Sequence, residues 1–290
     1  MLASLYLFSV VIITPRVTEM DCKEKTSNVY YPAVWISDVH LGYKDCQAHY
    51  LLDFLNRIDC GTLYLVGDIV DLWSMKRQFY WHQSHYEVLA CIQRKAQSGT
   101  RVIYIPGNHD ETFRYYVNNT LFGVEVHQQY IHTTAANKRF LLIHGDDFDS
   151  ATRYNKFISL VGDAGYDLLL FLNRWTNRTR RLFGGHYWSL ASWIKARVHK
   201  AREAIEAFEN AAIYEAKRQG VDGIICGHIH HPQLKVVDGI VYCNDGDWIE
   251  NCTALVENDN GRIELIHWSE KQTILESADI SDIQTTQSAA

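Results

Sequence analysis

The octapeptide AVWISDVH, residues 33–40, sets the pattern for the whole chain, because four apolar residues run directly into polar side chains, among them an aspartate and a histidine. A short apolar run that ends in polar residues is typical of a buried strand. Asp38 and His40 follow this strand two positions apart, so we expect Val39 to point away while both flanking residues face one site. The octapeptide therefore predicts a buried strand with a carboxylate and an imidazole at its carboxyl end.

The same arrangement recurs four more times along the chain. Strands are predicted at 62–66, 101–105, 138–143 and 221–226, and amphipathic helices at 47–58 and 83–98. The four strands run into the motifs GDIVD (67–71), GNHD (107–110), HGD (144–146) and GHIH (227–230). Open α/β sheets bind their ligands at the carboxyl ends of their strands. We therefore expect an α/β fold with one polar site built from five strand ends.

Residues 150–220 interrupt this rhythm with long helical stretches rich in arginine, lysine and tryptophan. One long helix is predicted between an N-cap at Ser189 and a C-terminal glycine at Gly220. The segment holds 12 lysines and arginines against 6 acidic residues, whereas the rest of the chain holds 16 against 28. A cationic wall beside an acidic metal site is suited to an anionic substrate.

The length of 290 residues and the high apolar content predict one compact catalytic unit at 33–270. Residues 1–32 form an expected N-terminal extension, and residues 271–290 an expected polar tail. The apolar run Leu2–Thr14 is too short to span a bilayer, so an over-extended reading frame and a weak membrane-surface anchor both remain open. Four further short strands, linked by Asp-Gly and Asn-Gly turns, are predicted at 233–237, 240–243, 253–256 and 263–268.

Seven scattered cysteines without a Cys-X-X-Cys pair indicate reduced thiols in a cytoplasmic protein. Cys91 and Cys226 lie in apolar runs and are predicted to be core residues.

Taken in order, the five motifs resemble those of the calcineurin-like metallophosphoesterase superfamily. The resemblance implies a four-layer α/β/β/α sandwich of two mixed sheets with a helical cap insertion at about 150–220. It also implies a pair of divalent ions, with Mn²⁺ expected and Fe²⁺, Zn²⁺ and Mg²⁺ binding overlapping ligand sets. The implied ligands are Asp38, His40 and His230 for one ion, Asn108, His144 and His228 for the other, and Asp68 as the bridge between them.

His109, Asp71 and Asp110 belong to the outer part of that pattern. A histidine at this position protonates an alkoxide leaving group, and an acidic neighbour orients it. If the leaving group is a phosphate, a general acid is unnecessary and His109 acts as an electrostatic stabiliser. The alternative is a histidine that only packs beside the site.

Within the superfamily, the segments SDVHL (37–41) and GDIVDLW (67–73) and the helical insertion are similar to the UDP-2,3-diacylglucosamine pyrophosphatase group of bacterial lipid A synthesis. This resemblance implies substrate contacts from the insertion, at Arg174, Arg178, Arg181 and Trp188. The alternative is an ordinary amphipathic helix pair with a solvated basic face. His109 departs from that group, whose well-known members carry arginine there.

The expected reaction is hydrolysis of UDP-2,3-diacylglucosamine to UMP and 2,3-diacylglucosamine 1-phosphate by a cytoplasmic enzyme in transient contact with the inner membrane. The alternative keeps the metal site and changes the substrate to another phosphodiester, a nucleotide or a phosphoprotein. The acidic body makes nucleic acid an unfavourable partner. A non-catalytic scaffold is a third possibility, but scaffolds usually lose ligands, and all seven are present.

Overall fold

The computed structural model describes residues 28–150, 172–180, 182–184, 186–190, 199–270 and 272–278. The described residues leave out most of the expected N-terminal extension, Arg181, and residues 191–198 of the long helix predicted from Ser189.

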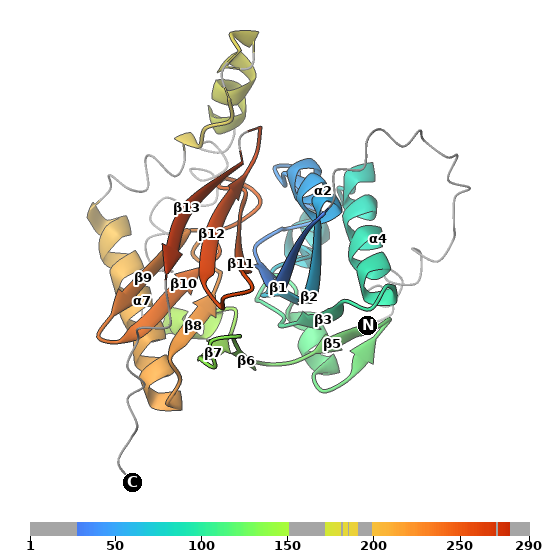
Figure 1. Cartoon of the computed structure of the whole chain (residues 1–290). Coiled ribbons are helices and arrows are strands. Elements are labelled where there is room, and N and C mark those ends of the chain that lie inside the picture. Colours follow the sequence, from blue (N-terminus) through green and yellow to red (C-terminus); the bar gives the residue numbers. More distant parts are fainter. Residues whose placement is uncertain are drawn as a thin grey trace.

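Two mixed β-sheets form the centre of the molecule (Figure 1). The first has the strand order β13-β12-β11-β1-β2-β3-β5-β4 and the second the order β6-β7-β8-β10-β9. The strands of the first sheet are β1 (Val29–Ile36), β2 (Ile58–Leu65), β3 (Arg101–Tyr104), β4 (Thr120–Leu121), β5 (Val124–Val126), β11 (Thr253–Glu257), β12 (Ile263–Trp268) and β13 (Gln272–Ala278). Those of the second are β6 (Tyr130–Thr133), β7 (Arg139–Leu142), β8 (Gly223–Cys226), β9 (Gln233–Val237) and β10 (Ile240–Asn244).

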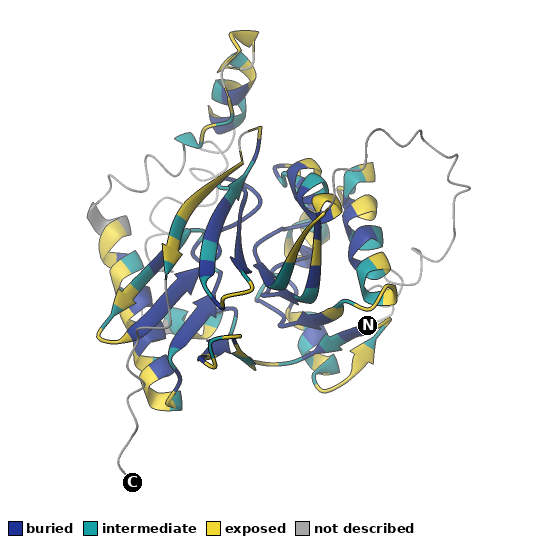
Figure 2. Cartoon of the chain, in the orientation of Figure 1, coloured by how far each residue is buried: buried dark blue, intermediate teal, exposed yellow. Residues whose placement is uncertain are grey.

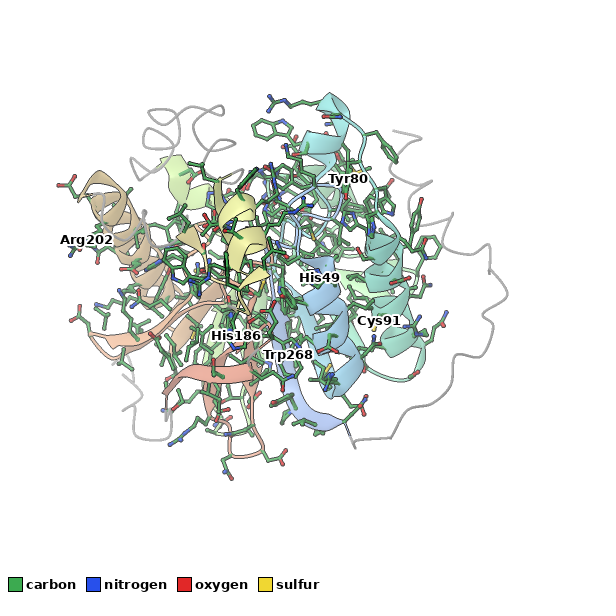
Figure 3. The ribbon with its side chains drawn as sticks, turned by 90° about the horizontal axis from the view of Figure 1, so that it is seen from above. His49, Tyr80, Cys91, His186, Arg202 and Trp268 are labelled. Carbon is green, nitrogen blue, oxygen red and sulfur yellow. The ribbon has the colours of Figure 1, made fainter. Side chains whose placement is uncertain are left out.

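Helices cover the outer face of each sheet. α2 (Ala48–Arg57) and α4 (Gln83–Gln97) pack on the first sheet, and α7 (His199–Gln219) packs on the second. Viewed from above, Cys91 on α4 and Arg202 on α7 lie on opposite sides of the molecule with the sheets between them (Figure 3). The four-layer α/β/β/α sandwich implied by the motifs is therefore confirmed.

Residues 33–36 of the octapeptide show why the apolar residues of the predicted strands follow one another without alternation. Val34 and Ile36 pack into the core beneath α2 and α4, whereas Ala33 and Trp35 pack into the core between the two sheets. All four side chains are fully buried. A strand covered on both faces needs apolar residues at every position, and not only at alternate ones. Figure 2 shows the resulting pattern, with buried strands inside and exposed surface on the outer helices.

The predicted element boundaries hold to within a few residues, except at the chain ends. β1 begins at Val29 rather than at residue 33, and β13 pairs antiparallel with β12 as far as Ala278. The domain is therefore larger than 33–270, and the expected tail contributes a strand. The helix that ends before Gly220 is confirmed at its C-terminus, where Gly220 has a φ of 63°. The Asp238-Gly239 turn between β9 and β10 has φ angles of 50° and 78°, as a tight hairpin requires.

The described residues between 172 and 190 of the insertion form a short hairpin whose first arm is helical. Residues 172–180 are helical and rise above the sheets, and from above they lie over the line between the two layers (Figures 1 and 3). Asn177 closes the hairpin, because its side chain donates to Trp188 O and accepts from Trp188 N, both at 2.8 Å. Leu182 and Phe183 at the tip are 79% and 90% exposed. This hairpin of the predicted basic, apolar insertion therefore protrudes, whereas α7 at the C-terminal end of the insertion packs on the second sheet.

The described cysteines form no disulfide, and Cys91 and Cys226 are buried in the core as expected. Among the helices of the described residues, none has the length and apolar character needed to cross a membrane.

Candidate metal centre

The backbone at the carboxyl ends of the strands is left-handed rather than extended. Asp38, His40 and Asp68 have φ angles of 49°, 52° and 54°, and His228 and His230 have φ angles of 69° and 50°. Asp38 and His40 do face one site, as expected, but the reason is this left-handed backbone and not the alternation of side chains along a strand. Non-glycine residues in this region are uncommon and cost about 1–3 kcal/mol each, and they cluster at functional sites.

Neighbouring loops hold this conformation through backbone hydrogen bonds. Asp38 N donates to Gly67 O at 3.0 Å, and His40 N donates to Asp68 O at 2.9 Å. The loops that follow β1 and β2 are thereby joined, and each fixes the ligands carried by the other.

Glycines allow the loops to approach the candidate ligands closely. A Cβ at Gly67 would lie 2.2 Å from His144 Nδ1, and one at Gly107 would lie 2.2 Å from Asp68 Oδ1. Real Cβ atoms essentially never come so near another atom. The glycines that precede Asp68 and Asn108 are therefore required by the packing of the site itself.

The first group of candidate ligands consists of Asp38, His40 and His230, whose ligand atoms all lie within 4.8 Å of one another. His230 Nε2 lies 3.2 Å from Asp38 Oδ1 and 3.4 Å from His40 Nε2. The second group consists of Asp68, His144 and His228 within the same limit. Asp68 Oδ2 lies 3.4 Å from His144 Nε2 and 3.9 Å from His40 Nε2, so one carboxylate oxygen adjoins both groups. That is the place expected of a bridging ligand.

The buried carboxylates of the two groups favour bound cations. In the described chain, the ion-pair contacts of Asp38 and Asp68 are all with imidazoles, and both carboxylates are buried. Burial alone would raise the pKa of Asp38, but His230 and His40 hold it well below its usual range. Burial alone would lower the pKa of His144, but Asp68 raises it to about 10. The buried carboxylates therefore favour positive charge beside them, which a divalent ion supplies.

Several atoms of the candidate ligands also make no hydrogen bond. Among the described residues, Asp38 Oδ1, Asn108 Oδ1 and His144 Nε2 are buried and accept or donate no hydrogen bond. Buried polar atoms without hydrogen-bond partners are rare and indicate an ion or water. Carboxylate, amide and imidazole donors suit borderline divalent ions. The residues present therefore fit a pair of divalent cations.

Comparison with known proteins agrees with this site. Residues 31–232 match the pattern of the calcineurin-like phosphoesterases. The chain belongs to the calcineurin-like phosphoesterase family. This phosphoesterase is accordingly a metal-dependent hydrolase, and its His/Asp clusters are consistent with a dinuclear divalent centre. A search among curated proteins gave no match.

Solved structures of similar fold include a single mutant of Vps29 from Entamoeba histolytica. It is 14% identical over 85% of this chain and 98% of that chain, with a TM-score of 0.42. YfcE, a phosphoesterase from E. coli, is 13% identical over 86% of this chain and 98% of its own, with a TM-score of 0.45.

His109 lies beside the metal groups and shares a carboxylate with His40. Asp71 Oδ1 lies 3.0 Å from His109 Nδ1, and Asp71 Oδ2 lies 3.1 Å from His40 Nδ1. The His109 ring stands edge-on to Trp73, which is 63% exposed. The His109 side chain is 22% exposed, whereas that of Asp71 is 3% exposed. The phosphoesterase therefore presents an oriented imidazole at the mouth of the site, with its Nε2 turned away from Asp71.

Asp110 has a different place from the one expected of a catalytic group. Its carboxylate is fully buried and accepts backbone hydrogen bonds from Gly107 N at 2.6 Å and Ile69 N at 2.7 Å. Asp110 therefore joins the loops that carry Asp68 and Asn108, and it acts as a positioning residue. Burial and the charge of Asp68 raise its pKa to about 6.

The loop of residues 244–251 was not identified from the sequence, and its side chains contact the loops that carry Asp38, His228 and His230. Ser37 Oγ donates to Asp38 Oδ2 and lies 2.6 Å from Asp245 Oδ1. Asn244 Nδ2 donates to Gly227 O at 2.7 Å, and Asn251 Nδ2 donates to His230 O at 3.1 Å. The sequence NDGDWIEN offered a signal, since so many polar residues between two apolar strands seldom pack without a specific role.

The predicted substrate residues are only partly placed. Arg174 forms an ion pair with the buried Asp45, so it fastens the hairpin to the core. Arg178 is exposed on the same helix, and Arg180 lies over the Trp188 ring at 5.7 Å. Arg181 lies outside the described residues.

Proposed function

We propose that this phosphoesterase hydrolyses a phosphodiester whose leaving group departs as an alkoxide. The contact between His109 and Asp71 carries the proposal. An alkoxide has a high pKa, so its departure needs a proton from a positioned acid, whereas a phenolate or phosphate departs without one. The Asp71 carboxylate orients His109 through Nδ1 and leaves His109 Nε2 as the atom that delivers the proton.

The chain's own residues divide the remaining work. Asp38, His40 and His230 would hold one divalent ion, Asn108, His144 and His228 the other, and Asp68 would bridge them. When bound, the ion pair supplies an activated water and neutralises charge on the phosphoryl oxygens. Asp71 keeps His40 and His109 in fixed orientations, and Asp110 keeps the two ligand-bearing loops together. We propose Mn²⁺ as the native ion.

The second candidate substrate is UDP-2,3-diacylglucosamine, cleaved at its pyrophosphate bond to UMP and 2,3-diacylglucosamine 1-phosphate. The hairpin of residues 172–190 favours it, because exposed apolar side chains at its tip are flanked by Arg178 and Arg180. Such a surface suits a lipid-linked anion and transient contact with a membrane surface. His109 counts against this candidate, because the phosphate leaving group of a pyrophosphate has a low pKa and needs no general acid.

The experiment is a substrate panel with metal-stripped protein, with and without added Mn²⁺. It compares bis-(p-nitrophenyl) phosphate, glycerophosphoethanolamine, UDP-2,3-diacylglucosamine, a phosphopeptide and p-nitrophenyl phosphate. Each substrate is tested with the wild type and His109→Asn. Mn²⁺-dependent cleavage of glycerophosphoethanolamine that falls about 10²–10⁴-fold in His109→Asn, with the phenyl diester little affected, supports the proposal.

Other outcomes distinguish the alternatives. Release of UMP at a rate independent of His109 favours the lipid pyrophosphatase. Turnover confined to the phosphopeptide or to p-nitrophenyl phosphate would identify the enzyme as a phosphomonoesterase. It would reject both the phosphodiester and the lipid pyrophosphate as substrates. Equal activity with and without metal would overturn the dinuclear mechanism as a whole.

A further inference from the structure

Each of three candidate metal-binding imidazoles has an oxygen atom close to one of its ring nitrogens. His40 Nδ1 lies 3.1 Å from Asp71 Oδ2, and His144 Nδ1 lies 2.9 Å from Val66 O. His228 Nε2 lies 2.9 Å from Asp149 Oδ1. The first two contacts leave Nε2 for the metal. The third belongs to Asp149, a residue that none of the five motifs includes.

The Asp149 carboxylate approaches His228 from outside the metal cluster. Asp68, His144 and His228 form a group whose ligand atoms lie within 4.8 Å of one another, and among the described residues Asp149 is no member of it. Asp149 is 16% exposed, and its buried Oδ1 atom meets His228 Nε2 in an ion-pair contact that lacks hydrogen-bond geometry. This geometry is that of a carboxylate that holds a metal-binding histidine, and not of a further ligand to the ion.

The His228 ring is also fixed by packing. It stands edge-on to His144 with ring centroids 5.2 Å apart, and Phe208 lies against it at 6.0 Å. Phe208 is fully buried on α7 and packs edge-on against Phe148, at 5.4 Å. Phe148 and Asp149 belong to η3 (Asp146–Ser150), which leads into the insertion, whereas α7 is the C-terminal helix of the insertion. The segment before the insertion and its C-terminal helix therefore both contact His228.

We propose that Asp149 is the positioning residue of the second metal site, which it controls by holding His228. The carboxylate fixes the tautomer and orientation of the imidazole and makes its other nitrogen a better donor to the ion. Because Asp149 directly precedes the insertion and Phe208 lies on its C-terminal helix, the packing of the insertion is thereby tied to the affinity of that site. This inference rests on the proposed dinuclear centre, but not on the identity of the substrate.

The test is Mn²⁺ binding measured by calorimetry and by electron paramagnetic resonance on metal-stripped full-length protein. The variants are Asp149→Ala and Asp149→Asn, and Asp147→Asn is the matched control, because Asp147 is an exposed acid on the same η3 segment. His230→Ala serves as the reference for weakened binding at the first site. Circular dichroism of each metal-free variant checks folding.

We expect Asp149→Ala to weaken one of the two binding steps by about 10–100-fold, namely the step that His230→Ala leaves intact. Asp149→Asn should restore part of the loss, since its amide keeps an oxygen beside His228 Nε2 but removes the negative charge. Asp147→Asn should bind Mn²⁺ as the wild type does. If the wild type shows two binding steps and Asp149→Ala leaves both unchanged, or weakens both equally, the role of Asp149 is overturned. Fewer than two steps in the wild type would instead overturn the dinuclear centre on which it rests.

Discussion

Asp71 Oδ1 lies 3.0 Å from His109 Nδ1, while the other oxygen of the same carboxylate lies 3.1 Å from the Nδ1 atom of His40. One buried carboxylate thus orients both a candidate metal ligand and the candidate proton donor. Asp71 also caps the short helix α3 (Leu72–Arg77) by accepting from Ser74 N at 2.7 Å. The N-cap of α3, the orientation of the candidate ligand His40 and the orientation of the candidate proton donor His109 therefore all depend on the Asp71 side chain.

Replacement of Asp71 should affect both functions at once. In Asp71→Asn we expect Mn²⁺ affinity to fall about 10–100-fold, because His40 loses its carboxylate partner. Turnover at saturating Mn²⁺ should fall as well, because His109 is no longer oriented. Titration with Mn²⁺ and kcat measured at saturation separate the two effects. A variant fully rescued by excess Mn²⁺ would show that Asp71 serves the metal alone.

Loss of a central ligand should abolish activity without unfolding the protein. We expect His144→Ala and Asp68→Ala to reduce kcat by more than about 100-fold, the largest effect usual for an outer partner of a metal ligand. Metal content should fall in both, because His144 lies at the second site and Asp68 adjoins both. Elemental analysis and thermal unfolding of the metal-free proteins provide the measurements. Full activity in either variant would contradict the dinuclear assignment.

The close approach of Gly67 to His144 can be tested against a glycine of matched conformation. Gly67 and Gly99 have φ angles of 87° and 101°, but only at Gly67 would a Cβ meet another residue within 4 Å. Gly99→Ala should cost about 1–2 kcal/mol of stability and leave kcat unchanged. Gly67→Ala should cost at least as much and also displace His144, with loss of metal. Equal activity in the two variants would argue against this packing constraint.

His85 predicts a pH dependence of stability away from the metal site. Burial and the nearby His82 lower the pKa of His85 from 6.5 to about 4, and its Nδ1 accepts a hydrogen bond from Gly42 N at 3.1 Å. The unfolded chain therefore binds a proton at higher pH than the folded one does. Its contribution to stability is present above about pH 6.5 and is lost as the pH falls toward 4.

Thermal unfolding of metal-free wild type and His85→Gln between pH 4 and pH 7 tests this expectation. Glutamine keeps an acceptor but does not titrate, so the variant should lose less stability than the wild type over this range. Parallel curves for the two proteins would show that His85 does not control the transition. His186→Gln is a suitable control, because His186 is exposed and, unlike His82, does not contribute to the pKa of His85.

The strand ends were predictable from sequence because the candidate ligands follow apolar runs that are buried on both faces. Trp35 and Ile36 illustrate this, since they face different layers and are both fully covered. The seven ligand positions follow from motif order, and the structure brings six of them into two compact groups, with Asn108 beside them as a buried amide oxygen.

Other features depend on contacts between distant residues, which one sequence does not reveal. Ser37 meets Asp245 across 208 positions, and Asp149 meets His228 from the far side of the insertion. β13 was missed because its side chains are mostly exposed and it has little apolar signal. The contacts of Asp110 were not predictable for a related reason, since its burial and its hydrogen bond from Ile69 N depend on a loop distant in the sequence.

The left-handed backbone at Asp38, His40, Asp68, His228 and His230 also limits how this site can change during evolution. Asparagine, aspartate, histidine and glycine tolerate that conformation, whereas β-branched residues are strongly disfavoured in it. A descendant that lost its metals would still inherit the loop geometry. Its vacated ligand positions should therefore fill with asparagine or glycine well before valine or isoleucine, which would leave a recognisable trace of the ancestral enzyme.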